Sequence, residues 1–129
     1  MSTNDEKGGR ADKGIEIIRK LGIRRGAPLP EDLATITVEH LFGDIWNRPG
    51  LELEERSLVT VAALIALGRE GEQRIHLRGA LKLGIPLAKL EEVIVHLAHY
   101  GGWPVAVGAS RVLAEVVAEL EQEESTGAK

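Results

Sequence analysis

The sequence predicts an all-α protein, and two observations support this prediction. Apolar residues recur at the helical spacing i, i+3, i+4 and i+7, most clearly at Leu90, Val93, Ile94 and Leu97. No stretch shows the alternation of apolar and polar residues that is typical of a strand, and the chain contains no internal repeat. Breaks rich in glycine and proline separate six segments of helical pattern, so we expect a six-helix bundle.

The first two segments occupy the N-terminal part of the chain. Residues 15–21 have helical spacing and end at Gly22, a residue typical of the position after a helix. Residues 31–46 resume the pattern after the loop 24–30, whose two prolines and glycine cannot continue a helix. The turn 47–50 then ends the second segment.

The third segment, residues 53–69, is the one around which the chain is organised. Residues 57–67 are almost wholly apolar and too short to span a bilayer, so we expect a helix buried on every side in a soluble domain. The fourth segment, residues 70–83, is rich in charged and imidazole side chains. The junction at Gly68 therefore places acid, base and cation next to a rigid apolar scaffold, which is typical of a functional site.

The last two segments, residues 87–100 and 105–120, follow breaks at 84–86 and 101–104. The final segment is valine-rich on several sides. Six short helices offer more apolar surface than one compact core covers, which favours a homo-oligomer. The alternative is that two helices cross deep inside one bundle.

Length and composition set the domain organisation and exclude several functions. We expect one domain at 13–120, a flexible N-terminal lead at 1–12 and a flexible tail at 121–129, because 129 residues with 43% hydrophobic content bury one core. The net charge is −4 without a basic block, so we expect no nucleic acid partner and no membrane partner. The absence of cysteine excludes disulfides and thiol catalysis. The polar first residues do not resemble a signal peptide, so we expect a cytoplasmic location.

The fourth segment holds the first candidate for catalysis. Glu72 and His76 are four residues apart, and Arg69 precedes Glu72 by three, so the three side chains share one helix face. A carboxylate beside an imidazole raises the pKa of the imidazole and orients the ring, which gives a proton donor near neutral pH. The alternative is an ordinary pair on a solvated helix surface.

The fifth segment repeats this spacing at His96 and Tyr100, which flank the apolar stripe. The alternative is a polar pair at the rim of the helix, with the Tyr100 ring merely packing. We interpret His40 and His99 as surface residues. No HExxH motif is present, so we expect no metal site.

Arginines are concentrated around the central segments of a chain that is acidic overall. A guanidinium beside an apolar wall binds a carboxylate in a bidentate pose, so the group predicts a pocket for a small anion. The alternative is surface pairing with neighbouring glutamates. The arginines concerned are Arg48, Arg56, Arg69, Arg74 and Arg78.

Five motifs, distributed over residues 46–104, make the chain recognisable. They are Trp46-x-Arg48-Pro49-Gly50-Leu51, Arg56-Ser57-Leu58-Val59-Thr60, Ala66-Leu67-Gly68-Arg69-Glu70, Glu72-x-Arg74-x-His76-Leu77-Arg78 and His96-x-x-x-Tyr100-x-Gly102-x-Pro104. With these motifs the chain resembles the 4-carboxymuconolactone decarboxylase family of the alkyl hydroperoxidase D-like superfamily. The two cysteines of that superfamily's Cys-x-x-Cys-x-x-x-His motif would fall on Arg69 and Glu72, so thiol peroxidase chemistry is excluded.

The resemblance implies an alkyl hydroperoxidase D-like bundle that assembles as a trimer or hexamer, with active sites near subunit contacts. It also implies cofactor-free decarboxylation of 4-carboxymuconolactone to 3-oxoadipate enol-lactone, in the protocatechuate branch of the β-ketoadipate pathway. No cofactor is needed because the lactone carbonyl accepts the electrons that carbon dioxide leaves behind. The partner is thus a small anionic lactone substrate.

Chemistry and position together suggest a role for each candidate residue. We hypothesise that His76, oriented by Glu72, is the general acid that protonates the dienolate. The arginines that bind the substrate carboxylates would be Arg48, Arg56 and Arg69. His96 and Tyr100 would be secondary hydrogen-bond donors, and Trp46 would form an apolar wall of the site.

The sequence departs from the family pattern at Arg25-Gly26-Ala27, Lys82-Leu83-Gly84 and Pro86. These departures leave a second hypothesis, a diverged member that acts on another lactone or β-keto acid, or a non-catalytic binding subunit. Retention of Glu72, Arg74 and His76 together favours an enzyme.

Overall fold

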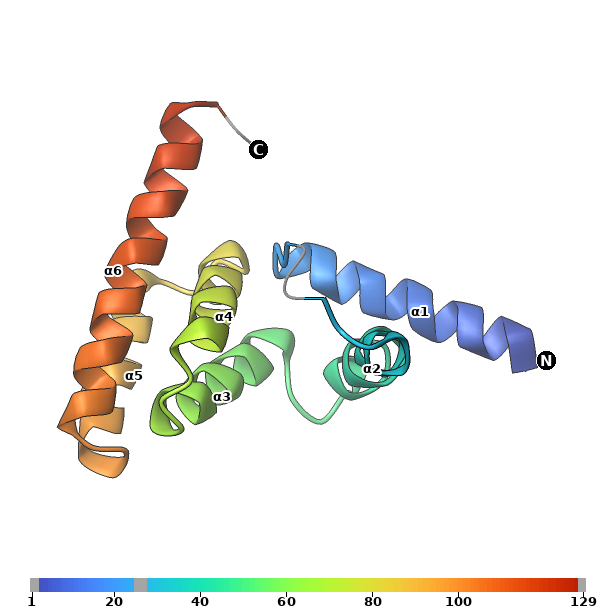
Figure 1. The fold of residues 1–129 in the computed structure, drawn as a ribbon, viewed down its shortest axis with the longest axis horizontal. Helices are drawn as coiled ribbons and strands as arrows, with labels where there is room; N and C mark the ends of the chain where they lie inside the picture. The colour runs from blue at the N-terminus through green and yellow to red at the C-terminus, as the bar shows by residue number, and fades with distance from the viewer. Residues whose placement is uncertain (1–2, 25–27, 128–129) are drawn as a thin grey trace. The chain divides into compact units, whose positions relative to one another are not determined.

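The computed structural model describes residues 3–24 and 28–127, and the regular structure in these residues is helical throughout (Figure 1). The all-α prediction is therefore confirmed for this part of the chain. The elements in order are α1 (Thr3–Lys20), α2 (Glu31–Ile36), the π-helix η1 (Thr37–Phe42), the 3-10 turn η2 (Ile45–Asn47), α3 (Leu53–Ala66), α4 (Glu70–Lys82), α5 (Leu87–Tyr100) and α6 (Trp103–Ser125). None of these described helices combines the length and apolar character needed to cross a bilayer.

The chain forms two compact units, Met1–Arg56 and Ser57–Lys129. Helix α3 begins in the first unit and continues into the second. The predicted domain limits at 13–120, and the flexibility expected for 1–12 and 121–129, stay predictions. The departure from the family pattern at positions 25–27 lies outside the described residues.

In the first unit, helix α1 begins at Thr3 rather than at residue 15, and tertiary packing explains this extension from Arg10 onward. Gly14 of α1 lies against the carbonyl of Val38, and Gly43 lies against the carbonyls of Arg10 and Glu39. A Cβ atom at either glycine would collide with these backbone atoms, so the two glycines allow α1 to pack closely on η1. Neighbouring structure, rather than an apolar pattern, thus supports residues 10–14, which precede the predicted start of the helix.

The single helix expected over residues 31–46 is also wrong, because this stretch forms α2, η1 and η2 in succession. The side-chain amide of Asn47 donates to the carbonyls of Phe42 and Gly43 at 2.8 and 3.4 Å. It thereby satisfies carbonyl groups at the end of η1 that a continuing helix would have bonded. The last helix is longer than predicted at both ends, and Pro104 lies in its first turn.

In the second unit, α5 and α6 pack together and α4 packs on α6. The predicted stripe of α5 is confirmed, since Leu90, Ile94 and Leu97 are buried and Val93 packs against the same core. The expectation that residues 57–67 are buried on every side is wrong in this chain. Helix α3 buries one stripe, while Val59 and Leu67 remain 58% and 71% exposed. An apolar run makes burial favourable, but burial requires a neighbour on each side.

Candidate active site

Helix α4 begins after a glycine turn that fixes its first residue. Gly68 has φ +69°, and the backbone N–H groups of Gly68 and Arg69 donate to the carbonyls of Ile65 and Leu64 at 3.0 and 2.9 Å. This pair of bonds ends α3 and leaves Arg69 at the N-cap of α4. The Arg69 side chain is exposed and forms no ion pair with another described residue. Its guanidinium is therefore available to an anionic ligand.

His76 lies one turn along α4 from Glu72, and the structure brings these two predicted residues together. The imidazole is half-buried with its Nδ1 atom enclosed, whereas Glu72 is exposed. Burial lowers the pKa of His76 below its ordinary value of 6.5, and the Glu72 carboxylate acts in the opposite direction. Glu72 thus raises the pKa of His76 as predicted, but the expectation that the net pKa is raised is wrong. Desolvation dominates because the charge of an exposed carboxylate is screened by solvent.

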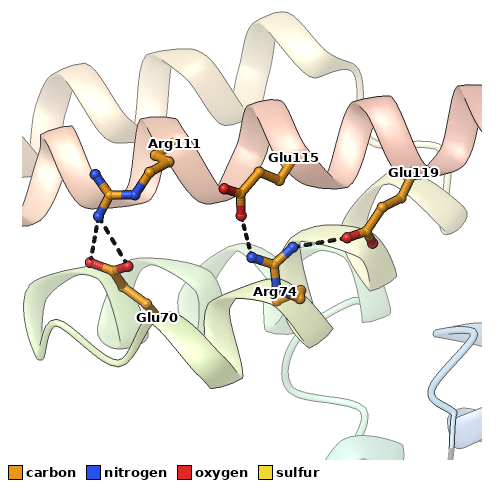
Figure 2. Close-up of polar contacts among 5 residues, drawn as sticks. All are labelled: Glu70, Arg74, Arg111, Glu115 and Glu119. Atoms are coloured by element: carbon orange, nitrogen blue, oxygen red, sulfur yellow. Dashed lines mark hydrogen bonds and ion pairs between the residues drawn. The ribbon is translucent and has the colours of Figure 1, made fainter.

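Two of the predicted anion-binding arginines, Arg74 and Arg78, are instead paired with helix α6, and Figure 2 shows the pairing of Arg74. Arg74 lies between Glu115 and Glu119, 3.0 Å from the Glu119 carboxylate, and Arg78 holds the carboxylate of Glu123 at 2.9 and 3.1 Å. We call these pairs, together with Glu70 and its α6 partner Arg111 at 3.3 Å, the α4–α6 ladder. Arg74 and Arg78 stand two residues before and after His76, so they project from the opposite side of the helix. They do not contribute a free cation to the His76 face.

His96 and Tyr100 are also brought together, since their rings stack at 4.9 Å with 27° between the planes. Tyr100 is 80% exposed, so the pair lies at the rim of the helix. His96 borders a groove of 410 Å³ between α3 and α5, which neither Glu72 nor His76 lines. The groove is formed by Leu58, Val59, Ala62, Lys89, Glu92, Val93, His96 and Leu97.

Arg48, Arg56 and Trp46 belong to the first unit. Arg56 donates from Nη2 to the backbone carbonyl of Arg48 at 2.9 Å, whereas the Arg48 side chain is exposed. Trp46 is only 7% exposed and packs on Phe42 at 5.7 Å between ring centroids. Its visible role is to fill the core of its own unit, and the role of an apolar wall stays a prediction.

The remaining histidines lie at the surface, as predicted. His40 has an exposed side chain 3.3 Å from Arg10 and 3.8 Å from Asp44. His99 is exposed, its Nδ1 lies 2.9 Å from the Val95 carbonyl oxygen, and its ring meets Trp103 edge-on. Across the part of the chain that the structure describes, no group of three or more carboxylate or imidazole side chains converges as a metal site would require.

Gln73 is a residue of this region that the sequence pattern did not single out. Its side chain is fully buried, three residues before His76 and four before the core residue Leu77. That spacing places an amide on the core-facing side of α4, and it is the signal in the sequence that could have identified the residue.

This chain is similar to one protein family and to several known proteins. The model of the carboxymuconolactone decarboxylase family matches residues 31–115, a range that contains every candidate site residue. The 4-carboxymuconolactone decarboxylase of Acinetobacter baylyi is 40% identical over 90 residues, which span 70% of this chain and 67% of the relative. The nitrosuccinic acid decarboxylase of Metarhizium robertsii is 28% identical over 128 residues, which span 92% and 90%. An uncharacterized 15.0 kDa protein of Paracoccus denitrificans is 31% identical over 97 residues, which span 74% and 69%. These similarities support a carboxy-lyase activity.

Proposed function

Because the chain belongs to the carboxymuconolactone decarboxylase family, we propose that it catalyses the cofactor-free decarboxylation of 4-carboxymuconolactone to 3-oxoadipate enol-lactone. The observation that carries the proposal is the arrangement on α4. A half-buried imidazole, its carboxylate neighbour and a guanidinium without an ion pair among the described residues share one helix face, inside the matched range. This is the set of groups that the reaction needs.

The reaction balances without a redox partner. The bond between the ring carbon and the departing carboxylate breaks, and carbon dioxide leaves. The electron pair of the broken bond moves through the ring double bond onto the lactone carbonyl oxygen, which gives a dienolate. A proton then adds to carbon, and the carbonyl is restored. The protein has to hold a dianion, stabilise the dienolate oxygen and deliver one proton.

His76 is the proposed proton donor. Burial lowers the pKa of His76, so the ring is neutral near pH 7 in the free enzyme. A substrate with two carboxylates brings negative charge close to the ring and raises its pKa, so the imidazole takes up a proton as substrate binds. Glu72 contributes in the same direction. The imidazolium of His76, which is the proposed acid, thus forms only when substrate is bound beside it.

The substrate carboxylates are assigned to Arg69, Arg48 and Arg56, of which Arg69 has an exposed guanidinium that forms no ion pair with a described residue. His96 and Tyr100 are assigned as secondary donors and Trp46 as an apolar wall. We further propose that the enzyme is a cytoplasmic homo-oligomer, a trimer or hexamer.

A second candidate substrate is a nitro-substituted dicarboxylic acid. The relative named for nitrosuccinic acid aligns with 92% of this chain, a larger share than the lactone decarboxylase covers. Nitrosuccinate presents the same problem to a protein, since a nitro group takes the electron pair left by carbon dioxide and carbon is then protonated. Another lactone or a β-keto acid also provides such an electron acceptor.

A parallel assay separates these candidates. Purified enzyme is given 4-carboxymuconolactone or nitrosuccinate, and carbon dioxide release and loss of substrate are followed. We expect kcat/KM for the lactone to exceed that for nitrosuccinate. The reverse order would assign the nitro acid. No carbon dioxide from either substrate at micromolar enzyme would favour the non-catalytic subunit.

A further inference from the structure

Gln73 is a fully buried polar side chain in the second unit, at 0% exposure. Its Nε2 donates to the carbonyl of Leu64 at 3.1 Å, across the turn between α3 and α4. The same carbonyl accepts the backbone N–H of Arg69 at 2.9 Å. Gln73 therefore ties the turn that positions Arg69 to the interior of α4.

The orientation of this amide is set by its partner. A carbonyl oxygen only accepts hydrogen bonds, so Nε2 must face Leu64 and Oε1 must face the other way. Oε1 is buried and has no hydrogen-bond partner in the described part of the chain. A buried acceptor without a donor is unfavourable, and anchoring the turn requires only the donor half of the amide. The acceptor half is left for another group.

The next polar group on this side of α4 is His76. Residues three apart on a helix are neighbours on its surface, and the Nδ1 atom of His76 is buried, as Oε1 of Gln73 is. The field of the Glu72 carboxylate reaches the His76 ring, and Glu72 lies at the exposed side of the helix. A buried acceptor and a buried ring nitrogen thus occupy adjacent positions.

We propose that Gln73 is a positioning residue for His76. Its Oε1 accepts a hydrogen bond from one enclosed water, and that water accepts the Nδ1–H of the imidazole. This bond holds the neutral ring as the Nδ1–H tautomer, with Nε2 facing the substrate as the atom that takes up and delivers the proton. The inference rests on the proposed role of His76. It adds a residue that links the Arg69 turn to the orientation of the catalytic ring.

The test is a titration of the four histidines by NMR with ¹⁵N-labelled imidazole, in the wild type, Gln73→Leu and Gln73→Glu. Leucine nearly conserves the volume and removes the amide. We expect the neutral His76 ring of the wild type to carry its proton on Nδ1, and Gln73→Leu to move the tautomer towards Nε2–H and lower the pKa of His76 further. Gln73→Glu should raise that pKa, because it places a carboxylate beside the ring.

Three internal controls and one surface variant accompany the titration. His40, His96 and His99 should titrate as in the wild type, and Gln122→Leu, an exposed glutamine on α6, should leave His76 unchanged. An unchanged tautomer and pKa of His76 in a folded Gln73→Leu variant would overturn the proposal. If Gln73→Leu does not fold, an unchanged pKa of His76 in Gln73→Glu would overturn it.

Turnover provides an independent measurement. Loss of the positioning bond should lower kcat by about 10- to 100-fold in Gln73→Leu, with a much smaller change in KM. If Gln73 served only to anchor the turn between α3 and α4, Gln73→Leu would lower stability and leave the tautomer of His76 unchanged. The NMR result does not depend on decarboxylation, so failure of the positioning role and failure of the proposed function are observed separately.

Discussion

Helix α4 and its N-cap carry charged or imidazole side chains at three- or four-residue spacing on two sides, and the two sides behave differently. On the ladder side, Glu70, Arg74 and Arg78 each pair with side chains of α6, and Figure 2 shows the pairs of Glu70 and Arg74. On the other side, Arg69 and Glu72 are exposed without an ion pair to a described residue, and His76 is half-buried. Similar spacing therefore holds α4 against α6 on one side, and on the other side it leaves the charged groups of Arg69 and Glu72 exposed to solvent.

The difference comes from what the neighbouring helix provides. Helix α6 presents Glu115, Glu119 and Glu123 at intervals of four residues, which match the rise between Arg74 and Arg78. These pairs are partly solvated, with the Arg74 side chain 40% exposed and that of Arg78 12% exposed. Their contribution to stability is therefore modest. Substitutions on the two sides should separate activity from stability.

The largest expected effect is on turnover in His76→Asn. Removing the proposed proton donor should lower kcat for 4-carboxymuconolactone by about 10² to 10⁴-fold, the usual range for general acid catalysis. The measurement is the initial rate at saturating substrate, with circular dichroism to confirm the fold. His40→Asn is the matched control, because that ring is exposed, and its rate should equal that of the wild type. A His76→Asn enzyme with near-normal kcat would remove the residue from the mechanism.

The second effect tests the free guanidinium. Arg69→Met keeps an unbranched side chain but cannot bind a carboxylate, so kcat/KM should fall by about 10- to 100-fold. Arg19→Met is the control, since Arg19 forms an exposed pair with Glu16 on α1. The comparison of the two sides of α4 would be contradicted if Arg74→Met lost substrate affinity and Arg69→Met did not.

The third effect is on stability and belongs to the ladder. Arg78→Met leaves the half-buried carboxylate of Glu123 without this partner and should lower the free energy of unfolding by about 1–2 kcal/mol. Arg74→Met should cost about 0.5–1 kcal/mol, because its pairs are more exposed. Urea denaturation measures both values. Concentrated salt should shrink the Arg74 difference, and kcat/KM should stay within about twofold of the wild type for both variants.

The smallest effect is the pH dependence that the pKa of His76 confers on stability. Burial holds this pKa below its ordinary value of 6.5, so below pH 6.5 the unfolded chain binds a proton that the folded chain does not. Stability from this residue is present above that pH and is lost as the pH falls through the lowered pKa. The loss is about 1.4 kcal/mol for each unit of depression.

Unfolding of the wild type and His76→Asn by urea at several pH values measures this contribution as a difference. The free-energy gap between the two proteins should be constant above pH 6.5 and should change in favour of the variant in acid. A gap that stays constant down to pH 4 would mean that the ring is not desolvated.

The local features of the fold were available from the sequence. Gly22 and Gly84 adopt positive φ and end helices where the pattern predicted breaks, and the apolar stripe of α5 is buried as its spacing indicated. Gly68 also adopts positive φ, and α3 therefore ends at Ala66 rather than at the predicted residue 69. The pairing of Glu72 with His76 also followed from spacing, because residues four apart on a helix must be neighbours. These properties depend on short stretches of chain and on the steric limits of the backbone.

The features that arise from packing between distant segments were decided by the tertiary structure. The packing of residues 10–14 of α1 depends on the approach of Gly14 and Gly43 to neighbouring backbone, which no local pattern records. The partners of Arg74 and Arg78 lie about forty residues away on α6, so the spacing of arginines could not distinguish a ladder from an anion pocket. The downward shift of the pKa of His76 depends on the volume that encloses the ring, because the energy of a charge is set by its surroundings as well as by its nearest partner.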